Sequence, residues 1–208
     1  MHLPSYSIGD KIYNKIPEIC EPYGTRVIAI GGHKAIAAAK DKIIAACKES
    51  KLEILDFIWY GGEATYENVE KLMENDLVKQ ADMIFSIGGG ESTDTGKCLG
   101  VKCGKPVFSF PTIASNCSAC TSVSIMYYPD GRFKEPFFFQ APPVHAFIDT
   151  DILVHSPSRY MWAGMGDTMA KYFESSMSSR GEELNHYTQM GVYVSKMCYE
   201  PVLRYGKE

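Results

Sequence analysis

The sequence lacks both a long apolar run and a basic cluster. No apolar segment of its 208 residues approaches the length that spans a bilayer, and no basic stretch suits a nucleic-acid backbone. The formal net charge is −4, and the first residues do not form a basic region followed by an apolar one. We therefore expect a cytoplasmic protein without nucleic-acid or membrane partners.

Cysteine and histidine do not form recognisable ligand sets. The seven cysteines, an odd number in a chain without a signal-peptide pattern, predict reduced thiols rather than a disulfide framework. Cys117 and Cys120 form a single Cys-x-x-Cys, and a zinc site of that type would need a second pair. No two of the five histidines are spaced to share one helical face.

Strand-like and helix-like segments alternate through the first part of the chain. Such alternation predicts a parallel sheet with right-handed crossovers, in a Rossmann-like α/β domain. Ligands of such sheets bind beyond the carboxyl ends of the strands. We expect strands at residues 26–30, 52–59, 81–87 and 106–110, and helices at residues 34–47, 66–79 and 92–101.

The pattern then changes to a hairpin followed by helices. The turn Pro129-Asp130-Gly131 separates strand-like residues 122–128 from 132–139, and residues 144–148 form a further strand. From Pro157 onward the sequence is helical, with a loop-like interruption at residues 163–166. We expect two domains, a nucleotide-binding α/β domain at residues 1–156 and the beginning of an all-helical domain at residues 157–208.

The end of the chain carries an apolar stripe that two helices cannot bury by themselves. Burial of six such side chains contributes on the order of 10 kcal/mol, which is comparable to the stability of a small domain. We therefore expect the helical domain to be incomplete. The stripe consists of Leu184, Tyr187, Met190, Val194, Met197 and Cys198.

The most informative feature is the turn Gly88-Gly89-Gly90, which follows an apolar strand and precedes a helix. Glycines let the backbone approach a ligand closely, and the first amides of a helix attract anions. The turn therefore predicts a phosphate-binding site; the alternative is a tight strand-to-helix connection without a ligand. It is neither a Walker loop, since position 91 is Glu, nor the Gly-x-Gly-x-x-Gly fingerprint.

Three motifs occur in a fixed order along the chain. They are Gly88-Gly89-Gly90 with Asp94, Thr95 and Lys97; Pro111-Thr112-Ile113-Ala114-Ser115; and Ala163-Gly164-Met165-Gly166-Asp167. Together with Gly61-Gly62-Glu63, they resemble the glycerol dehydrogenase branch of the iron-containing alcohol dehydrogenase family, in the dehydroquinate-synthase-like superfamily. The likeness covers the amino-terminal portion of that family.

The resemblance implies an oxidoreductase that uses NAD or NADP and a divalent metal, zinc or iron, to oxidise an alcohol or polyol. It implies that the metal activates the alcohol oxygen while hydride moves between the carbinol carbon and the nicotinamide. Asp167 would be the catalytic metal ligand, although Gly166-Asp167-Thr168 also suits a helix N-cap. The dinucleotide would contact Gly88, Gly89, Gly90, Thr112, Ser115, Thr121, Val123 and Tyr127.

Three positions depart from the family pattern. Cys117 replaces the usual substrate-contacting Asp, so the substrate contact would be a thiol and the identity of the alcohol or ketone stays open. Glu91 replaces a common Lys, and its carboxylate either faces a phosphate or turns outward and favours the helix start. His33 replaces the acidic residue that would hold the adenosine ribose, and we expect it in an exposed loop.

The resemblance also implies two further metal ligands, histidines on later helices that this sequence does not contain. A catalytic metal site normally has three protein ligands, so we expect an incomplete site. The chain would be a truncated product, or a helical-domain polypeptide would complete it; a homo-oligomer is also expected. The alternative function is a non-catalytic nucleotide-binding module or a subunit of a split enzyme.

Overall fold

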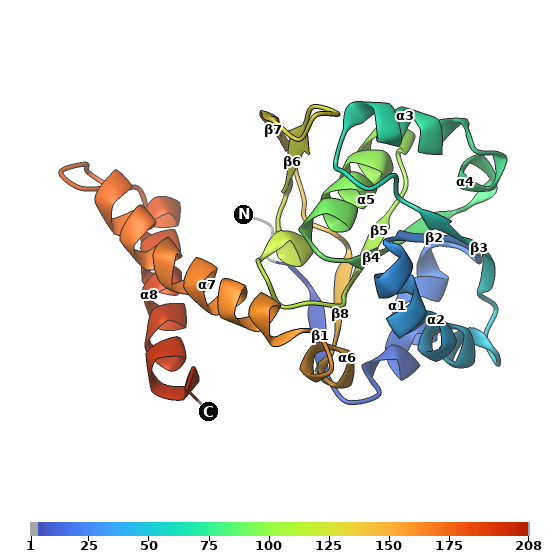
Figure 1. Cartoon of the computed structure of the whole chain (residues 1–208), viewed down its shortest axis with the longest axis horizontal. Helices are drawn as coiled ribbons and strands as arrows, with labels where there is room; N and C mark the ends of the chain where they lie inside the picture. Colours follow the sequence, from blue (N-terminus) through green and yellow to red (C-terminus); the bar gives the residue numbers. More distant parts are fainter. Residues whose placement is uncertain (1–3, 208) are drawn as a thin grey trace. The chain divides into compact units, whose positions relative to one another are not determined.

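The computed structural model describes residues 4–207, which form two compact units (Figure 1). The α/β unit contains residues 4–113 and 117–156, and the helical unit contains residues 114–116 and 157–207. The predicted folding domains, 1–156 and 157–208, stay a prediction, because close contacts alone do not test independent folding.

A six-stranded parallel sheet forms the centre of the α/β unit. The strands lie in the order β1 (Tyr6–Gly9), β8 (His145–Asp149), β5 (Val107–Pro111), β4 (Met83–Gly88), β2 (Arg26–Gly31) and β3 (Glu53–Trp59). The predicted parallel α/β class is confirmed. The short edge strand β1 was not predicted from the sequence, because four residues with a half-exposed pattern carry a weak signal.

Helices cover both faces of this sheet (Figure 1). On one face, α1 (Ile16–Cys20) and α2 (His33–Cys47) pack against Val27 and Ala29 of β2. On the other face, α3 (Tyr66–Glu74), α4 (Asp76–Gln80) and α5 (Gly90–Cys103) pack against Ile28 and Ile30. Side chains alternate along β2 between two apolar layers, and a strand buried on both faces therefore appears as a continuous apolar run.

The single helix that we expected at residues 66–79 is in fact two helices, α3 and α4. The helical character was predicted correctly, but the break between them was not. Asn75 ends α3 in an extended conformation, and its side-chain oxygen accepts a hydrogen bond of 2.8 Å from the Leu77 amide at the start of α4. The apolar spacing continues across this break because both helices bury residues in the same layer. Periodicity alone therefore does not reveal the cap.

The predicted hairpin is confirmed as an antiparallel pair, β6 (Val123–Tyr127) and β7 (Phe133–Phe138). Gly131 takes a positive φ of 81° in the connecting turn, a conformation that glycine adopts without strain. The hairpin is joined to α5 by hydrogen bonds. The Ser124 hydroxyl donates to the Asp94 carbonyl at 2.9 Å, and the Ile125 amide donates to the Asp94 carboxylate at 3.1 Å.

The helical unit contains α7 (Ser158–Ser178) and α8 (His186–Tyr205). They contact one another through a 2.8 Å hydrogen bond between the Ser175 and Ser195 hydroxyls and through the Tyr172 and Tyr199 rings. Apolar side chains of the predicted stripe remain exposed: Tyr187 by 59%, Val194 by 52% and Met197 by 71%. A covering partner for this face is considered below.

The predicted interruption at residues 163–166 was wrong, because α7 runs through it without a break. Gly164 serves close packing instead. A Cβ atom at this position would lie 1.9 Å from the Ala114 carbonyl oxygen, so the helix can approach that backbone only through a glycine. Among the helices of residues 4–207, none is long and apolar enough to cross a bilayer.

Replacing His145 by glutamine is expected to reduce the loss of stability on acidification. His145 is 6% exposed and shares hydrogen bonds with the Ser5 and Ser7 hydroxyls, at 2.7 and 3.0 Å. Burial, followed by the Lys15 charge, lowers the pKa of His145. The unfolded chain therefore binds the proton more tightly, and the free energy of unfolding falls as pH drops below the ordinary histidine pKa of about 6.5.

Denaturant unfolding at about pH 8 and about pH 5.5 measures this difference for the wild type and the variant. His33→Gln provides the control, since it makes the same substitution at an exposed histidine. An equally steep acid loss in His145→Gln would contradict the assignment.

Candidate functional site

The carboxyl ends of four neighbouring strands meet at one edge of the sheet. Gly31 at the end of β2 pairs with Trp59 of β3 and with Ile87 of β4. Gly88, the last residue of β4, pairs with Pro111 at the end of β5. Gly31 at the end of β2 and the predicted glycine turn after β4 are therefore adjacent in the α/β unit.

The chain reverses its direction across the sheet between β2 and β4. From β2 it moves outward to the edge strand β3 and then returns to β4 on the other side of β2. In open α/β sheets, ligands bind at the crevice outside the strand ends at such a switch point. In this sheet the switch point lies at the ends of β2 and β4.

Two helix amino termini begin beside this switch point. The N-cap residues are Gly32 for α2 and Gly89 for α5. Glycine has no side chain to cap a helix, and the first helical amides have no partner within the helix. α2 and α5 pack on opposite faces of the sheet, so their amino termini approach the switch point from both faces, and helix termini of this kind favour anions.

Packing requires glycine on both sides of the crevice. Gly88 has a φ of 140°, and a Cβ there would lie 2.2 Å from the Ser92 hydroxyl oxygen. A Cβ on Gly31 would lie 2.4 Å from the Ile87 carbonyl oxygen. The close approach of β2 and β4 thus explains Gly31 and Gly88 even without a ligand. The N-cap glycines, Gly32 and Gly89, are the ones that suit an anion.

Glu91 does not turn freely outward. Its carboxylate accepts a hydrogen bond of 2.7 Å from the Tyr60 hydroxyl, which reaches across from the end of β3. Burial, followed by the hydrogen bond to Glu91, raises the pKa of Tyr60, so the phenol keeps its proton and remains a donor. This contact holds the carboxylate toward β3 and was not predicted from the sequence.

His33 lies at the first position of α2 rather than in a loop, so the expected loop placement was wrong while its exposure was right. Its ring stacks on Trp59 with centroids 5.5 Å apart and an interplanar angle of 11°. Two flat rings thus stand at the β2 and β3 ends of the crevice, where the resemblance places the adenosine.

Lys97 joins α5 to the segment after β5. Its side chain is only 1% exposed, and its ammonium pairs with the Asp94 carboxylate at 2.8 Å. It also donates to the Ser118 carbonyl at 2.8 Å, to the Thr121 hydroxyl at 3.0 Å and to the Val123 carbonyl. Burial raises the pKa of Asp94 and lowers that of Lys97, while their mutual pairing opposes both shifts.

The α/β unit brings most of the predicted cofactor residues to one side of the sheet. The Thr112 amide donates to the Gly88 carbonyl at 3.3 Å, which ties the two loops together. Thr121 and Val123 are held by Lys97 as described above. Tyr127 is anchored farther along the hairpin, where its amide donates to the Ala64 carbonyl at 2.8 Å.

Ser115 and Asp167 belong to the helical unit. Asp167 lies inside α7, so the alternative of a helix N-cap is wrong. Its carboxylate pairs with Lys171 one turn later at 3.2 Å. No group of three His, Cys, Asp or Glu side chains within residues 4–207 is arranged to hold a metal ion. These residues therefore do not fit a complete metal centre.

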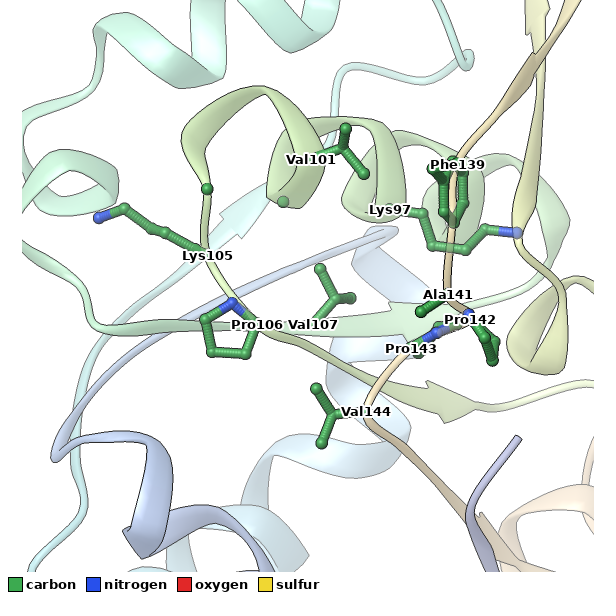
Figure 2. A pocket seen from close by; sticks show the side chains of 12 residues that line it. Lys97, Val101, Lys105, Pro106, Val107, Phe139, Ala141, Pro142, Pro143 and Val144 are labelled. Carbon is green, nitrogen blue, oxygen red and sulfur yellow. The ribbon is translucent and has the colours of Figure 1, made fainter. Parts of the chain in front are cut away.

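A cavity of about 310 Å³ lies elsewhere in the α/β unit. It is bordered by the end of α5, by Pro106 and Val107 at the start of β5, and by the connection from Phe139 to Val144 (Figure 2). Parallel strands bind ligands at their carboxyl ends, and this cavity lies at an amino end. None of the predicted cofactor residues lines it, although Lys97 does.

Replacing Lys97 by methionine is expected to lower the free energy of unfolding by about 3–5 kcal/mol, because it leaves the buried Asp94 charge and several acceptors without their donor. Chemical denaturation of the wild type and the variant measures the loss. Lys34→Met, at an exposed lysine of α2, is the control and should stay within about 0.5 kcal/mol of the wild type. A similarly small effect at Lys97 would contradict its structural importance.

The model of the family "Iron-containing alcohol dehydrogenase" matches residues 4–150. A glycerol dehydrogenase of Thermotoga maritima is 36% identical over 152 residues, which cover 71% of this chain and 41% of that protein. A glycerol dehydrogenase of Escherichia coli is 28% identical over 207 residues, covering 98% of this chain and 56% of that protein.

The fold is also shared with solved structures. The crystal structure of glycerol dehydrogenase from Schizosaccharomyces pombe superposes with a TM-score of 0.85 at 24% identity, covering 99% of this chain and 53% of the other. The chain thus spans about half the length of the relatives that it matches. On the strength of the family match over most of its length, the chain belongs to the iron-containing alcohol dehydrogenase family.

Proposed function

We propose that the α/β unit binds a nicotinamide dinucleotide, NAD(H) or NADP(H), for hydride transfer to or from a small alcohol, polyol or ketone. The observation that carries this proposal is the pair of glycine-capped helix termini, α2 and α5, beside the switch point between β2 and β4. The names of the relatives, several of them glycerol dehydrogenases, support the substrate class.

The diphosphate would lie against the amides that follow Gly32 and Gly89. Exposed backbone donors at two helix termini supply partial positive charge without a basic side chain. The adenosine would extend toward His33 and Trp59, whose stacked rings offer a flat apolar surface. Because His33 carries no carboxylate to repel a 2′-phosphate, both NAD and NADP are candidates.

The nicotinamide end would extend along the segment that Lys97 holds. In this arrangement Thr112 and Thr121 supply hydroxyl groups, and Val123 and Tyr127 line the ring. The bound dinucleotide supplies the hydride acceptor or donor. The part of these residues is to orient the ring and to keep water away. Lys97 fixes Thr121 and Val123, because its buried ammonium donates to the Thr121 hydroxyl and to the Val123 carbonyl.

The carboxylate of Glu91 lies beside the proposed phosphate position, where its negative charge would oppose binding. An unrestrained carboxylate about 6 Å from a phosphate would repel it by roughly 3 kcal/mol at an effective dielectric constant of about 20. The 2.7 Å hydrogen bond from Tyr60 holds the carboxylate toward β3 and so favours its positioning away from the amides of the turn.

Replacing Gly90 by aspartate is expected to weaken NADH binding by about 10- to 100-fold, because it adds a negative charge next to the diphosphate. The helix itself should tolerate the change, since acidic residues are favourable in the first turn of a helix. Isothermal titration calorimetry of the chain with NADH and with NADPH measures the affinities. Gly90→Asn is the matched control, since it has the same size without the charge.

Equal weakening in both variants would show a steric effect and contradict the diphosphate position. Absence of any binding heat for the wild type with either dinucleotide would contradict the proposed function. Binding of AMP and NADH without turnover in any reconstituted complex would favour the alternative, a non-catalytic nucleotide-binding module. That alternative is supported by the incomplete ligand set around Asp167 in the described part of the chain.

We further propose that a metal-assisted reaction needs ligands from outside this sequence. Asp167 would contribute one carboxylate, and the resemblance assigns the other ligands to histidines of a later helical region. The exposed apolar side chains of α8, including Tyr187, Val194 and Met197, would be covered by that region, whether in a complementing polypeptide or in a homo-oligomer. Burying such a face would stabilise the assembly.

The chain with added Zn²⁺ or Fe²⁺ is expected to bind NADH but to show no glycerol oxidation above background. Co-expression with the part of the Escherichia coli relative beyond the matched region should restore zinc- or iron-dependent turnover. Asp167→Asn should abolish the restored activity while leaving NADH binding unchanged, as measured by fluorescence titration. Robust glycerol oxidation by the chain alone with stoichiometric metal would contradict the proposed division of the metal site.

A further inference from the structure

Cys117 and Cys120 lie on one short turn beside Lys97. Cys117 is the N-cap of the 3₁₀ helix η3 (Ser118–Cys120), and the Cys120 amide donates a 3.0 Å hydrogen bond to the Cys117 carbonyl. This hydrogen bond closes a four-residue turn, with one cysteine at each end.

The separation across such a turn also suits a disulfide. A disulfide requires Cα atoms about 4.4–6.8 Å apart, and the ends of a hydrogen-bonded four-residue turn lie less than about 7 Å apart. Cys117 is exposed and Cys120 is half-buried. A reagent in solution can thus reach the Cys117 side chain, while the closed turn keeps the Cys120 backbone within the range that a disulfide needs.

The surroundings favour reactivity at Cys117. The Lys97 ammonium interacts electrostatically with both cysteines and donates a hydrogen bond to the carbonyl of Ser118, between them in sequence. A nearby cation stabilises the thiolate, which is the nucleophilic form. Burial raises the pKa of Cys120, which makes the exposed Cys117 the first to react.

Other cysteines of the α/β unit differ from this pair. Cys20, Cys47 and Cys98 are buried, and burial raises the pKa of Cys47 and of Cys98 to about 11. Cys103, which is half-buried, has its pKa raised by burial as well. Buried thiols without access to solvent are inert toward soluble oxidants.

We propose that Cys117 and Cys120 form a reversible oxidation site that hydroperoxides convert into an intramolecular disulfide. The Cys117 thiolate attacks one oxygen of hydrogen peroxide, which yields a sulfenic acid and releases hydroxide. The Cys120 thiolate then attacks the sulfenic sulfur, the S–S bond forms and a second hydroxide leaves. In total, two thiols lose two electrons and two protons while one peroxide is reduced to two water molecules.

A soluble dithiol restores the pair by two successive exchange steps, in which the dithiol becomes a disulfide. This chemistry does not depend on the proposed function. If that function holds, the disulfide ties Cys117 back at the position that the resemblance assigns to substrate contact, and oxidation would reduce turnover.

Peptide mass spectrometry of the full 208-residue chain tests the proposal. The reduced protein is treated with hydrogen peroxide, its remaining thiols are alkylated, and it is digested with chymotrypsin. The span from Ser109 to Tyr127 contains Cys117 and Cys120 and no other cysteine. The expected result is the loss of two hydrogen atoms and of both alkylation sites in this peptide, reversed by dithiothreitol.

Cys117→Ser and Cys120→Ser should each abolish the disulfide, whereas Cys198→Ser, at an exposed cysteine of α8, should leave it intact. The result in the wild-type protein decides the matter even if one variant fails to fold. Full alkylation of both cysteines at a peroxide dose that oxidises Cys198 would overturn the proposal. So would a sulfinic acid on Cys117 or a disulfide between two chains. Failure to bind NADH would contradict the proposed function but would leave this result unaffected.

Discussion

A buried ammonium group, that of Lys97, holds η3 and the start of β6 against α5. Its side chain is 1% exposed, and a charge in that position is tolerated only when it is paired and hydrogen-bonded. Asp94 from the same helix supplies the opposite charge, while acceptors at Ser118, Thr121 and Val123 satisfy the remaining N–H groups. One side chain thus fixes the position of a loop that has little regular structure of its own.

Through Lys97, the proposed nicotinamide contacts are linked to the proposed oxidation of Cys117 and Cys120. The loop carries residues proposed to contact the nicotinamide, and it carries the Cys117 and Cys120 pair. Because the same cation lies near both, a change at the cysteines can influence the cofactor side without any long-range mechanism. Such coupling needs only the short path from η3 through Lys97 to β6.

The proposed anion site depends on backbone amides rather than on basic side chains. The termini of α2 and α5 approach the same crevice because β2 and β4 are neighbours in the sheet. Glycine at Gly31 and Gly88 permits this approach, since a Cβ on either would contact neighbouring atoms at less than 2.5 Å. The carboxylate of Glu91 is compatible with an anion near these helix termini because a hydrogen bond from Tyr60 restrains it.

The amino-acid sequence by itself determined the parallel α/β class, the hairpin, and the glycine turn after β4. These features depend on periodicity and turn chemistry within a few residues. Only the tertiary structure decided the Tyr60–Glu91 contact, which spans 31 residues, and the Lys97–Thr121 contact, which spans 24. It also decided that α7 continues through Gly164, because the Ala114 carbonyl packs against that position. Spacing along a chain gives no information on which distant atoms meet, since those contacts arise from packing of whole elements.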